Sequence, residues 1–278
     1  MPEVELSSGT IDYEDTGGDG PVVVFVHGLI MDSSLWRHVV AQLRADFRCV
    51  APTLPLGGHR HPMHADADLS MRGIAGILGE LLERLDLREI TLATNDWGGP
   101  QLLIGGAHDA RIARLALCSC EAFDNVPPKG AARLLPYIAR VPGGIDAALL
   151  PFRLQRLRRP PMTFGSMSKR PVPREVMDRW FGPALEQRDV RRDLRTYVLS
   201  APQGRRDLLA AADALRSFDR PALVAWAAED RLMPREHGRR LAELLPQGRL
   251  VEIPDSYTLI PEDQPDALAA HLRELLAR

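Results

Sequence analysis

The sequence predicts an α/β fold, in which a mostly parallel, doubly wound sheet carries a helical insertion. Short apolar runs, many of them β-branched, recur along the chain, and such runs are typical of strands buried on both faces of a parallel sheet. Segments whose apolar residues recur about every 3.6 positions separate these runs and indicate helices. Strands that alternate with helices in this way are typical of a doubly wound sheet.

Five segments are the predicted strands. The clearest is Val22-Val23-Val24-Phe25-Val26, which is apolar throughout. The other four runs lie at residues 90–94, 112–118, 222–227 and 249–253. We expect all five to lie parallel in one sheet, because parallel neighbours need the long connections that separate these runs.

Two segments carry the strongest helical pattern. Residues 69–87 place apolar side chains on one helical face at Ile74, Ile77, Leu78, Leu81 and Leu82, and residues 266–278 follow the same spacing. Both segments are expected to cover the sheet.

The alternation stops between the strands at 112–118 and 222–227. This stretch is rich in proline and arginine, and it has short helical patches at 131–141 and 205–217. Apolar residues such as Leu134 and Ile138 distinguish it from a flexible linker. We therefore expect a core formed by residues 1–121 and 217–278, with residues 122–216 as a helical cap.

Composition excludes several classes of function. The 278 residues carry a net charge of −2, no apolar run approaches a membrane span, and the first residues, Met1-Pro2-Glu3, do not start a secretory signal. Three cysteines are too few for a disulfide framework. We expect a cytoplasmic monomer or homodimer that acts on a small molecule, without nucleic acid, membrane, metal or cofactor.

The sharpest local signal is Asn95-Asp96-Trp97-Gly98-Gly99, directly after a predicted strand. Glycines permit a tight strand–turn–helix corner, and such a corner raises one side chain above the carboxyl edge of the sheet, where ligands bind. A lone aspartate before a helix is also the usual N-cap. The surrounding residues favour an active-site position for Asp96.

Two further signals follow other predicted strands. His27-Gly28 comes after the strand at 22–26, where a loop can turn N–H groups toward a developing oxyanion. Asp230 follows the strand at 222–227 and places a second acid near the same sheet edge.

Together these residues resemble the α/β-hydrolase superfamily over nearly the whole chain, cap included. The Asp-Trp-Gly-Gly corner is most similar to the branch with an aspartate nucleophile, the haloalkane dehalogenases and epoxide hydrolases. The resemblance implies that Asp96 is the nucleophile and that the Trp97 side chain binds a halide or another anion. It also implies that His27 and Gly28 shape an oxyanion hole lined by the backbone N–H groups of Leu29 and Trp97.

The same resemblance implies a third catalytic group, a histidine oriented by an acid. Asp230 takes the place of the acid, and Glu121 is the alternative, because some dehalogenases carry the acid after that strand. The position of the histidine falls on Thr258. Threonine does not titrate near pH 7, and neighbouring Tyr257 has a pKa of ~10, so an ester formed on Asp96 would lack a base for its hydrolysis.

Another histidine could replace the missing one. His59, His61 and His64 lie in a loop expected near the mouth of the site. Their spacing is compatible with hydrogen bonding within the loop, with catalytic substitution and with a surface metal cluster.

Four aromatic residues are candidates for contacting the substrate: Trp36, Tyr137, Tyr197 and Tyr257. Epoxide hydrolases use two cap tyrosines to polarise the epoxide, and the resemblance offers Tyr137 and Tyr197 for that role. Each of the two also fits a packed aromatic, and Trp36 fits the core. The sequence thus predicts a hydrolase-like enzyme for a small or medium apolar substrate (an epoxide, haloalkane or ester), with Asp96 as nucleophile or base. The alternatives are a lyase, isomerase or cyclase of secondary metabolism, and a ligand-binding protein that has lost catalysis.

Overall fold

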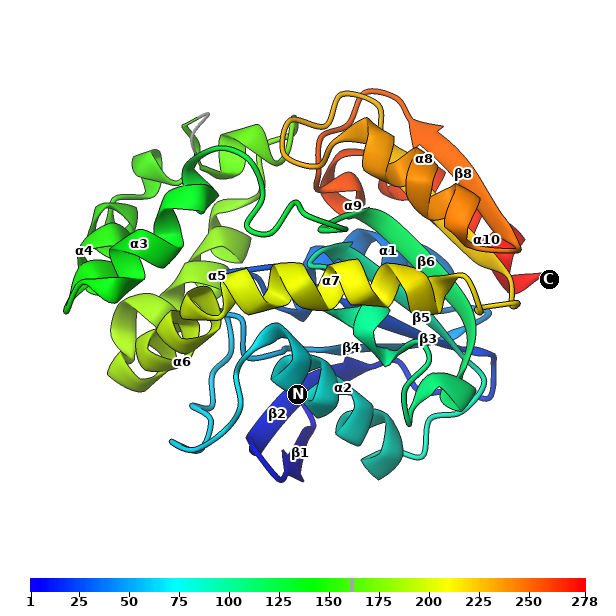
Figure 1. Cartoon of the computed structure of the whole chain (residues 1–278), viewed down its shortest axis with the longest axis horizontal. Coiled ribbons are helices and arrows are strands. Elements are labelled where there is room, and N and C mark those ends of the chain that lie inside the picture. Colours follow the sequence, from blue (N-terminus) through cyan, green and yellow to red (C-terminus); the bar gives the residue numbers. More distant parts are fainter. Residues whose placement is uncertain (161–162) are drawn as a thin grey trace.

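The computed structural model describes residues 1–160 and 163–278, and a single sheet runs through the middle of the described chain (Figure 1). The sheet has the order β1-β2-β4-β3-β5-β6-β7-β8. Its strands are β1 (Glu3–Leu6), β2 (Gly9–Asp15), β3 (Val22–Val26), β4 (Arg48–Pro52), β5 (Ile90–Asp96), β6 (Ile112–Cys120), β7 (Ala222–Ala227) and β8 (Gly248–Ile253).

The sheet is mostly parallel, which confirms the predicted fold class. From β4 to β8 neighbouring strands pair in parallel, while β1 and β2 form an antiparallel edge against β4. Strands β1, β2 and β4 were not among the five predicted strands. The first two lie at the edge and carry charged side chains such as Glu3 and Asp15, so they lack the apolar run of a central strand.

Helices cover both faces of the sheet. The α-helices are α1 (Arg37–Leu43), α2 (Met71–Arg84), α3 (Leu135–Arg140), α4 (Gly144–Leu149), α5 (Arg174–Glu186), α6 (Arg188–Leu199), α7 (Ala201–Leu215), α8 (Arg235–Leu244), α9 (Ile260–Asp263) and α10 (Pro265–Leu276). Short 3₁₀ helices are η1 (Ser33–Trp36), η2 (Gly99–Leu103), η3 (Asp109–Arg111), η4 (Ala131–Leu134), η5 (Leu150–Arg153), η6 (Gln155–Leu157) and η7 (Phe164–Ser166).

Successive side chains of the central strands enter two different apolar cores. Val24 and Val26 of β3 pack with residues of α2 and α7, whereas Val23 and Phe25 pack with residues of α1 and α10. This alternation follows from the two-residue period of a strand, and it explains why the run at 22–26 is apolar throughout.

The insertion between β6 and β7 is helical, as expected. Helices α3 to α6 stand together beside the sheet, at the left of Figure 1, while α7 lies along α2 and η2 on one face. Leu208 and Leu215 of α7 belong to the core below. We therefore propose that the cap ends before α7, short of the expected boundary at residue 216.

Within the described chain, no helix combines the length and apolar character needed to cross a bilayer. The three cysteines are buried, and each is a free thiol.

Candidate active site

The carboxyl ends of five strands meet at one edge of the sheet, below the cap. Parallel strands bring their carboxyl ends together, so residues far apart in the sequence become neighbours. The polar or structurally special residues that follow these ends are Gly28 after β3, Asp96 on β5, Glu121 after β6, Asp230 after β7 and Thr258 after β8.

Asp96 occupies the sharp corner at the end of β5. Its φ of +67° lies in the left-handed region, which is strained for most side chains, but which aspartate tolerates better than bulky residues. The carbonyl of Asp96 accepts a hydrogen bond from the N–H of Glu121 at 2.9 Å, which ties the corner to β6. The helix expected to follow is the 3₁₀ helix η2, because Pro100 and two glycines disfavour a regular α-helix here.

The loop after β3 closely approaches the Asp96 carboxylate. The Leu29 N–H donates to Asp96 Oδ2 at 3.2 Å. A Cβ atom on Gly28 would lie 1.9 Å from the same oxygen, so only glycine permits this approach. The Leu29 N–H predicted for the oxyanion hole therefore binds the carboxylate itself. The second predicted donor, the Trp97 N–H, is bonded to the carbonyl of Asn95 at 2.8 Å.

His27 holds this loop in place and is fully buried. Its Nε2 accepts from the Leu54 N–H at 2.8 Å, so Nδ1 carries the proton and donates to the Gly28 carbonyl at 2.8 Å. Burial lowers the pKa of His27 to about 4. His27 is thus a neutral positioning group, and it does not line the cavity described below.

Three side chains surround Asp96 from the other sides: Trp97, Glu121 and Tyr197, all nearly buried. The indole Nε1 of Trp97 is buried and meets no acceptor of the described residues at full hydrogen-bond geometry, but it lies close enough to the Tyr197 hydroxyl to oppose the rise in the pKa of that tyrosine. Burial raises the pKa of Tyr197, and the nearby charges of Glu121 and Asp96 raise it further. The predicted pocket roles of Trp97 and Tyr197 thus agree with their position in the cavity wall.

Glu121 lies in the cavity wall beside Asp96. Its Oε2 is 3.5 Å from the Gly98 N–H, and its carbonyl accepts from the Gln101 amide at 2.7 Å. A Cβ on Gly98 would lie 2.4 Å from that carbonyl, so this glycine permits the packing of the corner against β6. No histidine of the described residues is bonded to the Glu121 carboxyl, whose printed contact is the one with Gly98.

Burial favours the protonated form of both carboxyl groups. It raises the pKa of Asp96 to about 7, although the Leu29 N–H opposes the shift and the charge of Asp230 adds to it. Burial also raises the pKa of Glu121 well above its usual range, and the charge of Asp96 raises it further. Of the two carboxyl groups, Glu121 is the one whose protonated form is favoured both by burial and by the neighbouring Asp96 charge.

The side chains of Asp230 and Thr258 meet at the carboxyl edge of the sheet. The Thr258 hydroxyl donates to Asp230 Oδ1 at 2.8 Å, and the N–H groups of Leu232 and Met233 donate to the same oxygen. Asp230 Oδ2 is buried and has no partner in the described chain. Burial raises the pKa of Asp230, and these hydrogen bonds oppose the shift.

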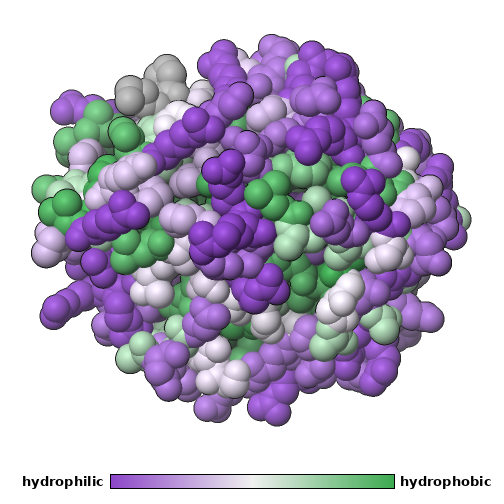
Figure 2. Space-filling view, in the orientation of Figure 1, coloured by the Kyte–Doolittle hydropathy of each residue, from purple (hydrophilic) through white to green (hydrophobic). Residues whose placement is uncertain are grey.

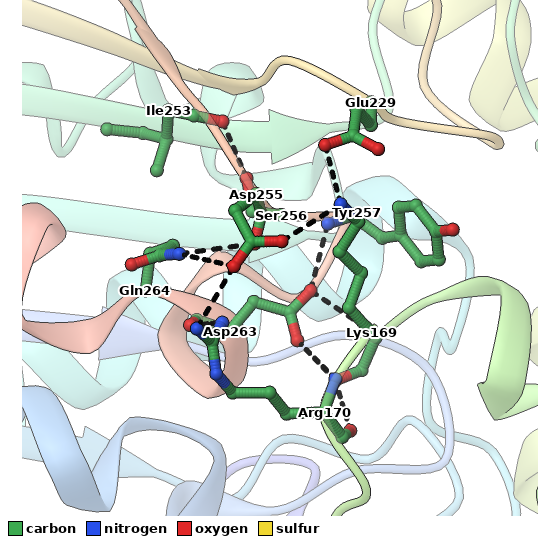
Figure 3. Close-up of polar contacts among 10 residues, drawn as sticks. Lys169, Arg170, Glu229, Ile253, Asp255, Ser256, Tyr257, Asp263 and Gln264 are labelled. Atoms are coloured by element: carbon green, nitrogen blue, oxygen red, sulfur yellow. Dashed lines mark hydrogen bonds and ion pairs between the residues drawn. The ribbon is translucent and has the colours of Figure 1, made fainter.

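The loop that carries Thr258 is held by a buried carboxylate, Asp263 (Figure 3). Asp263 accepts from the Ser168 hydroxyl, from the N–H groups of Lys169 and Arg170, and from the Tyr257 N–H, all at 2.8–2.9 Å. Residues 168–170 belong to the insertion and Tyr257 to the loop after β8, so Asp263 fastens one to the other. This contact was not predictable from the sequence, since a single aspartate among many forms no motif.

The loop is also fixed from below by Asn95, the residue before the corner. Its side-chain amide donates to the Thr258 carbonyl at 2.7 Å and to the Cys118 carbonyl at 2.8 Å. A polar residue in an otherwise apolar strand was the signal that could have identified this role.

The other histidines are occupied elsewhere. His59 is bonded to Asp193 at 3.2 Å, His61 to Glu3 at 3.1 Å and His64 to the Ser7 carbonyl at 3.2 Å. The three rings therefore serve separate contacts of the loop. Within the described residues, no group of three or more His, Cys, Asp or Glu side chains could hold a metal ion. No histidine is among the described residues that line the cavity.

A cavity of about 710 Å³ opens above Asp96, between the sheet edge and the cap. Asp96, Trp97 and Glu121 line it from the sheet edge, and Tyr197 of α6 lines it from the insertion. The remaining wall is largely apolar and includes Leu29, Ile30, Leu149, Phe152, Phe164, Phe181, Leu194 and Val198. A cavity of this size with a few polar groups at one end fits a medium-sized apolar molecule with one reactive polar group.

Three predicted substrate contacts are wrong. Tyr137 is 65% exposed, and its ring packs against Arg140 on the outside of the cap. Trp36 is buried in the core, 4.8 Å from the ring of Phe25. Tyr257 lies beneath the guanidinium of Arg231, and it is Arg231 that lines the cavity. Helical periodicity did not reveal which face of α3 points inward, and an aromatic residue serves equally well in a core.

A family model described as the alpha/beta hydrolase family matches residues 23–271. A cis-3-alkyl-4-alkyloxetan-2-one decarboxylase of Xanthomonas campestris pv. campestris is 28% identical, over 96% of this chain and 92% of that protein. Haloalkane dehalogenase 2 of Mycobacterium tuberculosis is 26% identical, over 97% of this chain and 92% of that protein.

The crystal structure of an ancestral haloalkane dehalogenase aligns with a TM-score of 0.81 and 22% identity. It covers 100% of this chain and 98% of the other. At this identity the alignment shows the shared fold alone.

Proposed function

Because the chain belongs to the alpha/beta hydrolase family, we propose that it is an enzyme that uses Asp96 to convert an apolar organic molecule in the cavity beneath the cap. One observation carries the proposal: the Asp96 carboxylate lines a largely apolar cavity, with the buried Trp97 indole N–H and the Glu121 carboxyl beside it, and burial favours the protonated form of Glu121. Such a pair of donors would stabilise a negative charge that leaves the substrate as Asp96 attacks.

The hydroxyl of Thr258 on Asp230 favours a reaction that needs no activated water. An ester of Asp96 formed from a haloalkane or an epoxide is released by water, and water at neutral pH needs a general base. A substrate that releases Asp96 by an internal elimination avoids this step. We therefore favour the lyase alternative over the hydrolase, with a strained cyclic ester as the substrate class.

A 2-oxetanone with alkyl groups on C3 and C4 meets these requirements, and a relative is named for the decarboxylation of such compounds. In the proposed first step, Asp96 attacks C4, the C4–O bond of the ring breaks, and the freed carboxylate on C3 accepts hydrogen bonds from Trp97 and Glu121. In the second step the bond between C3 and that carboxylate breaks. Its electron pair forms the C3=C4 double bond, carbon dioxide leaves, and the bond from C4 to Asp96 breaks.

Atoms and charges balance over the two steps without a water molecule or a proton. The Leu29 N–H on Oδ2 would orient the carboxylate so that Oδ1 faces the substrate. The apolar wall would hold the two alkyl chains and exclude water from the intermediate.

Product analysis tests the proposal. The protein is incubated with a cis-3,4-dialkyl-oxetan-2-one, and separately with epoxides, haloalkanes and activated esters. We expect an alkene and carbon dioxide from the oxetanone, and a stable adduct on Asp96, seen by intact mass, from a haloalkane. The Asp96→Asn variant should lose both, by a factor of about 10³ or more in turnover.

Other products would contradict the lyase assignment. A hydroxy acid from the oxetanone, or an alcohol or diol from the other substrates, would show that some group activates water and that the protein is a hydrolase. Neither an adduct nor a product in any series would leave only the ligand-binding alternative.

A further inference from the structure

The outside of the cap carries a concentration of exposed apolar side chains. Seven large apolar residues of the described chain are strongly exposed, and five of them fall between residues 134 and 154: Leu134 (57%), Tyr137 (65%), Val141 (58%), Leu150 (59%) and Leu154 (52%). Scattered single apolar residues are normal on a surface, whereas five within one short segment need an explanation.

These side chains lie on the outer side of the layer that forms the cavity wall. Leu135, Ile145, Leu149 and Phe152 from the same elements, α3, α4 and η5, point inward and line the cavity. Leu134 belongs to both sets, because it lines the cavity and is also exposed. The exposed apolar face therefore adjoins the entrance to the cavity.

The same segment is strongly basic in a chain that is slightly acidic overall. Residues 131–160 contain six arginines and one acidic residue, Asp146, whose carboxylate is already bonded to Arg191 at 2.6 Å. The exposed arginines of this segment are Arg133, Arg140, Arg153, Arg156 and Arg159. Figure 2 shows hydrophobic and hydrophilic residues interleaved in the region of α3 and α4, at the left of the view.

A recess of about 250 Å³ is lined by Gln155, Arg156, Arg158, Arg159, Arg174 and Met177, four of which are arginines. One carboxylate, Asp178, neutralises part of this charge, because it lies 2.5 Å from Arg158 and 3.8 Å from Arg174. The remaining arginines suit a phosphate group, which arginine binds with paired N–H donors.

We propose that this face of the cap, defined by the five apolar residues and five exposed arginines named above, docks on a membrane surface that contains anionic phospholipids. The apolar side chains would enter the boundary between headgroups and acyl chains, while the arginines bind the phosphates. An apolar substrate dissolved in the bilayer would then reach the cavity without crossing water. This is contact with a surface, not a span, so it revises the expectation that no membrane is a partner.

Charge argues against a second copy of the chain as the occupant. A two-fold contact would place the same arginines opposite one another, and few acidic residues lie in the segment to compensate. The proposal does not depend on the chemistry of Asp96, so its test requires no turnover.

Flotation with lipid vesicles tests it. We expect the protein to float with vesicles of equal parts phosphatidylglycerol and phosphatidylcholine, and to stay behind with phosphatidylcholine alone. Raising the salt from about 0.1 M to about 0.5 M should release most of it, because salt screens the attraction. Inorganic phosphate at the same ionic strength should release no more than chloride does, because a lone ion lacks the apolar contacts.

Matched variants locate the contact. Leu150→Ser and Arg156→Glu should each weaken binding to the anionic vesicles, and the two together by roughly tenfold or more. Leu209→Ser, an exposed leucine on α7, and Arg88→Glu, an exposed arginine near β5, should bind as the wild type does. All four positions are at the surface, so unchanged melting temperatures confirm that each variant is folded.

Three results would overturn the proposal. The protein could fail to bind anionic vesicles, it could bind both kinds of vesicle equally, or the control variants could lose as much binding as the cap variants. A concentration-dependent dimer that Leu150→Ser abolishes, without any vesicle binding, would assign the face to a second copy.

Discussion

At the scale of single residues, the proposed absence of ester hydrolysis depends on Thr258. Its hydroxyl occupies Asp230 Oδ1, while Asp230 Oδ2 is buried without a partner in the described chain. A buried carboxylate oxygen without a donor costs free energy. A histidine ring N–H at position 258 could donate a hydrogen bond to this oxygen. The site thus has the acid of an acid–histidine pair, Asp230, but threonine in place of the base.

The Thr258→His variant is expected to gain water activation. The imidazole would accept a proton from water while Asp230 stabilises its charged form, so the adduct that a haloalkane leaves on Asp96 should decay to alcohol. Intact mass against time measures this decay. Thr258 is fully buried, and the larger side chain should lower the free energy of unfolding by about 1–3 kcal/mol.

Thr258→Gln is the matched control, because it adds similar bulk without a titratable group. Its adduct should persist as in the wild type. Equal decay in both variants, or a persistent adduct in Thr258→His, would show that position 258 does not supply the missing base.

Glu121 is the second residue on which the proposed chemistry depends, because burial and the Asp96 charge both raise the pKa of its carboxyl. In the Glu121→Gln variant, the amide can still donate a hydrogen bond, but it cannot lose a proton. We expect turnover to fall by about tenfold or less, because the proposed steps transfer no proton and the amide still donates a hydrogen bond to the freed carboxylate. Formation of a haloalkane adduct needs no proton donor and should change less.

The pH profile distinguishes this role from a structural one. Wild-type turnover should rise as Asp96 ionises and fall at higher pH as Glu121 loses its proton, whereas the Gln variant should lack the fall. An identical profile in both proteins would remove Glu121 from the reaction.

At the scale of elements, Asp263 joins the insertion to the loop that carries Thr258. The Asp263→Asn variant replaces one carboxylate oxygen by an amide, so either the two donors on Oδ1 (Ser168 and Arg170) or the two on Oδ2 (Lys169 and Tyr257) lose their buried acceptor. We expect the free energy of unfolding to fall by about 2–4 kcal/mol, as measured by chemical denaturation.

Asp219→Asn serves as the control for Asp263→Asn. Asp219 is exposed, and its side chain makes no hydrogen bond with the described residues, so the change should stay within about 0.5 kcal/mol. Equal effects of the two substitutions would show that the contact with residues 168–170 does not stabilise the fold.

Strands and helices with a strong apolar pattern were predictable from the sequence, and those whose pattern depends on distant contacts were not. The strand β7 has the bounds expected, 222–227, because it is buried on both faces. Helix α2 runs from Met71 to Arg84, inside the expected 69–87. Strands β1 and β2 were missed because edge strands carry polar residues. An α-helix was expected in place of η2, because the glycines and the proline there were taken as signs of the corner and not as residues that disfavour an α-helix.

The site was predictable where it depends on strand ends and not where it depends on the orientation of a side chain. Asp96, Trp97, Glu121 and Tyr197 all line the cavity. Tyr137, on the same helical patch as cavity residues Leu135 and Pro136, faces outward instead. Whether a cap residue points inward is decided by packing between elements that the local pattern does not encode.

At the scale of the whole molecule, the buried acids make the stability of the fold depend on pH. Asp96 has a pKa of about 7 in the folded chain and an ordinary pKa of about 3.8 in the unfolded chain. Between these values the folded protein holds a proton that the unfolded chain releases. The stability contributed by this group is therefore complete below about pH 4, falls as the pH rises, and is lost above about pH 7.

The Asp96→Asn variant removes this dependence without removing the Leu29 N–H partner, because the amide oxygen can still accept. Relative to the wild type, it should gain stability steadily from pH 4 to pH 7 and reach a constant gain above, on the order of several kcal/mol. Denaturation curves of both proteins at each pH measure the difference, in which the other titrating groups largely cancel. Glu121 is expected to spread the rise over a wider pH range, since its own ionisation depends on the Asp96 charge.

If the two stability curves ran parallel from pH 4 to pH 8, Asp96 would have an ordinary pKa. Nucleophilic attack by Asp96 would then proceed unchanged down to about pH 4, and the same variant therefore connects the stability of the molecule to the chemistry proposed for its cavity.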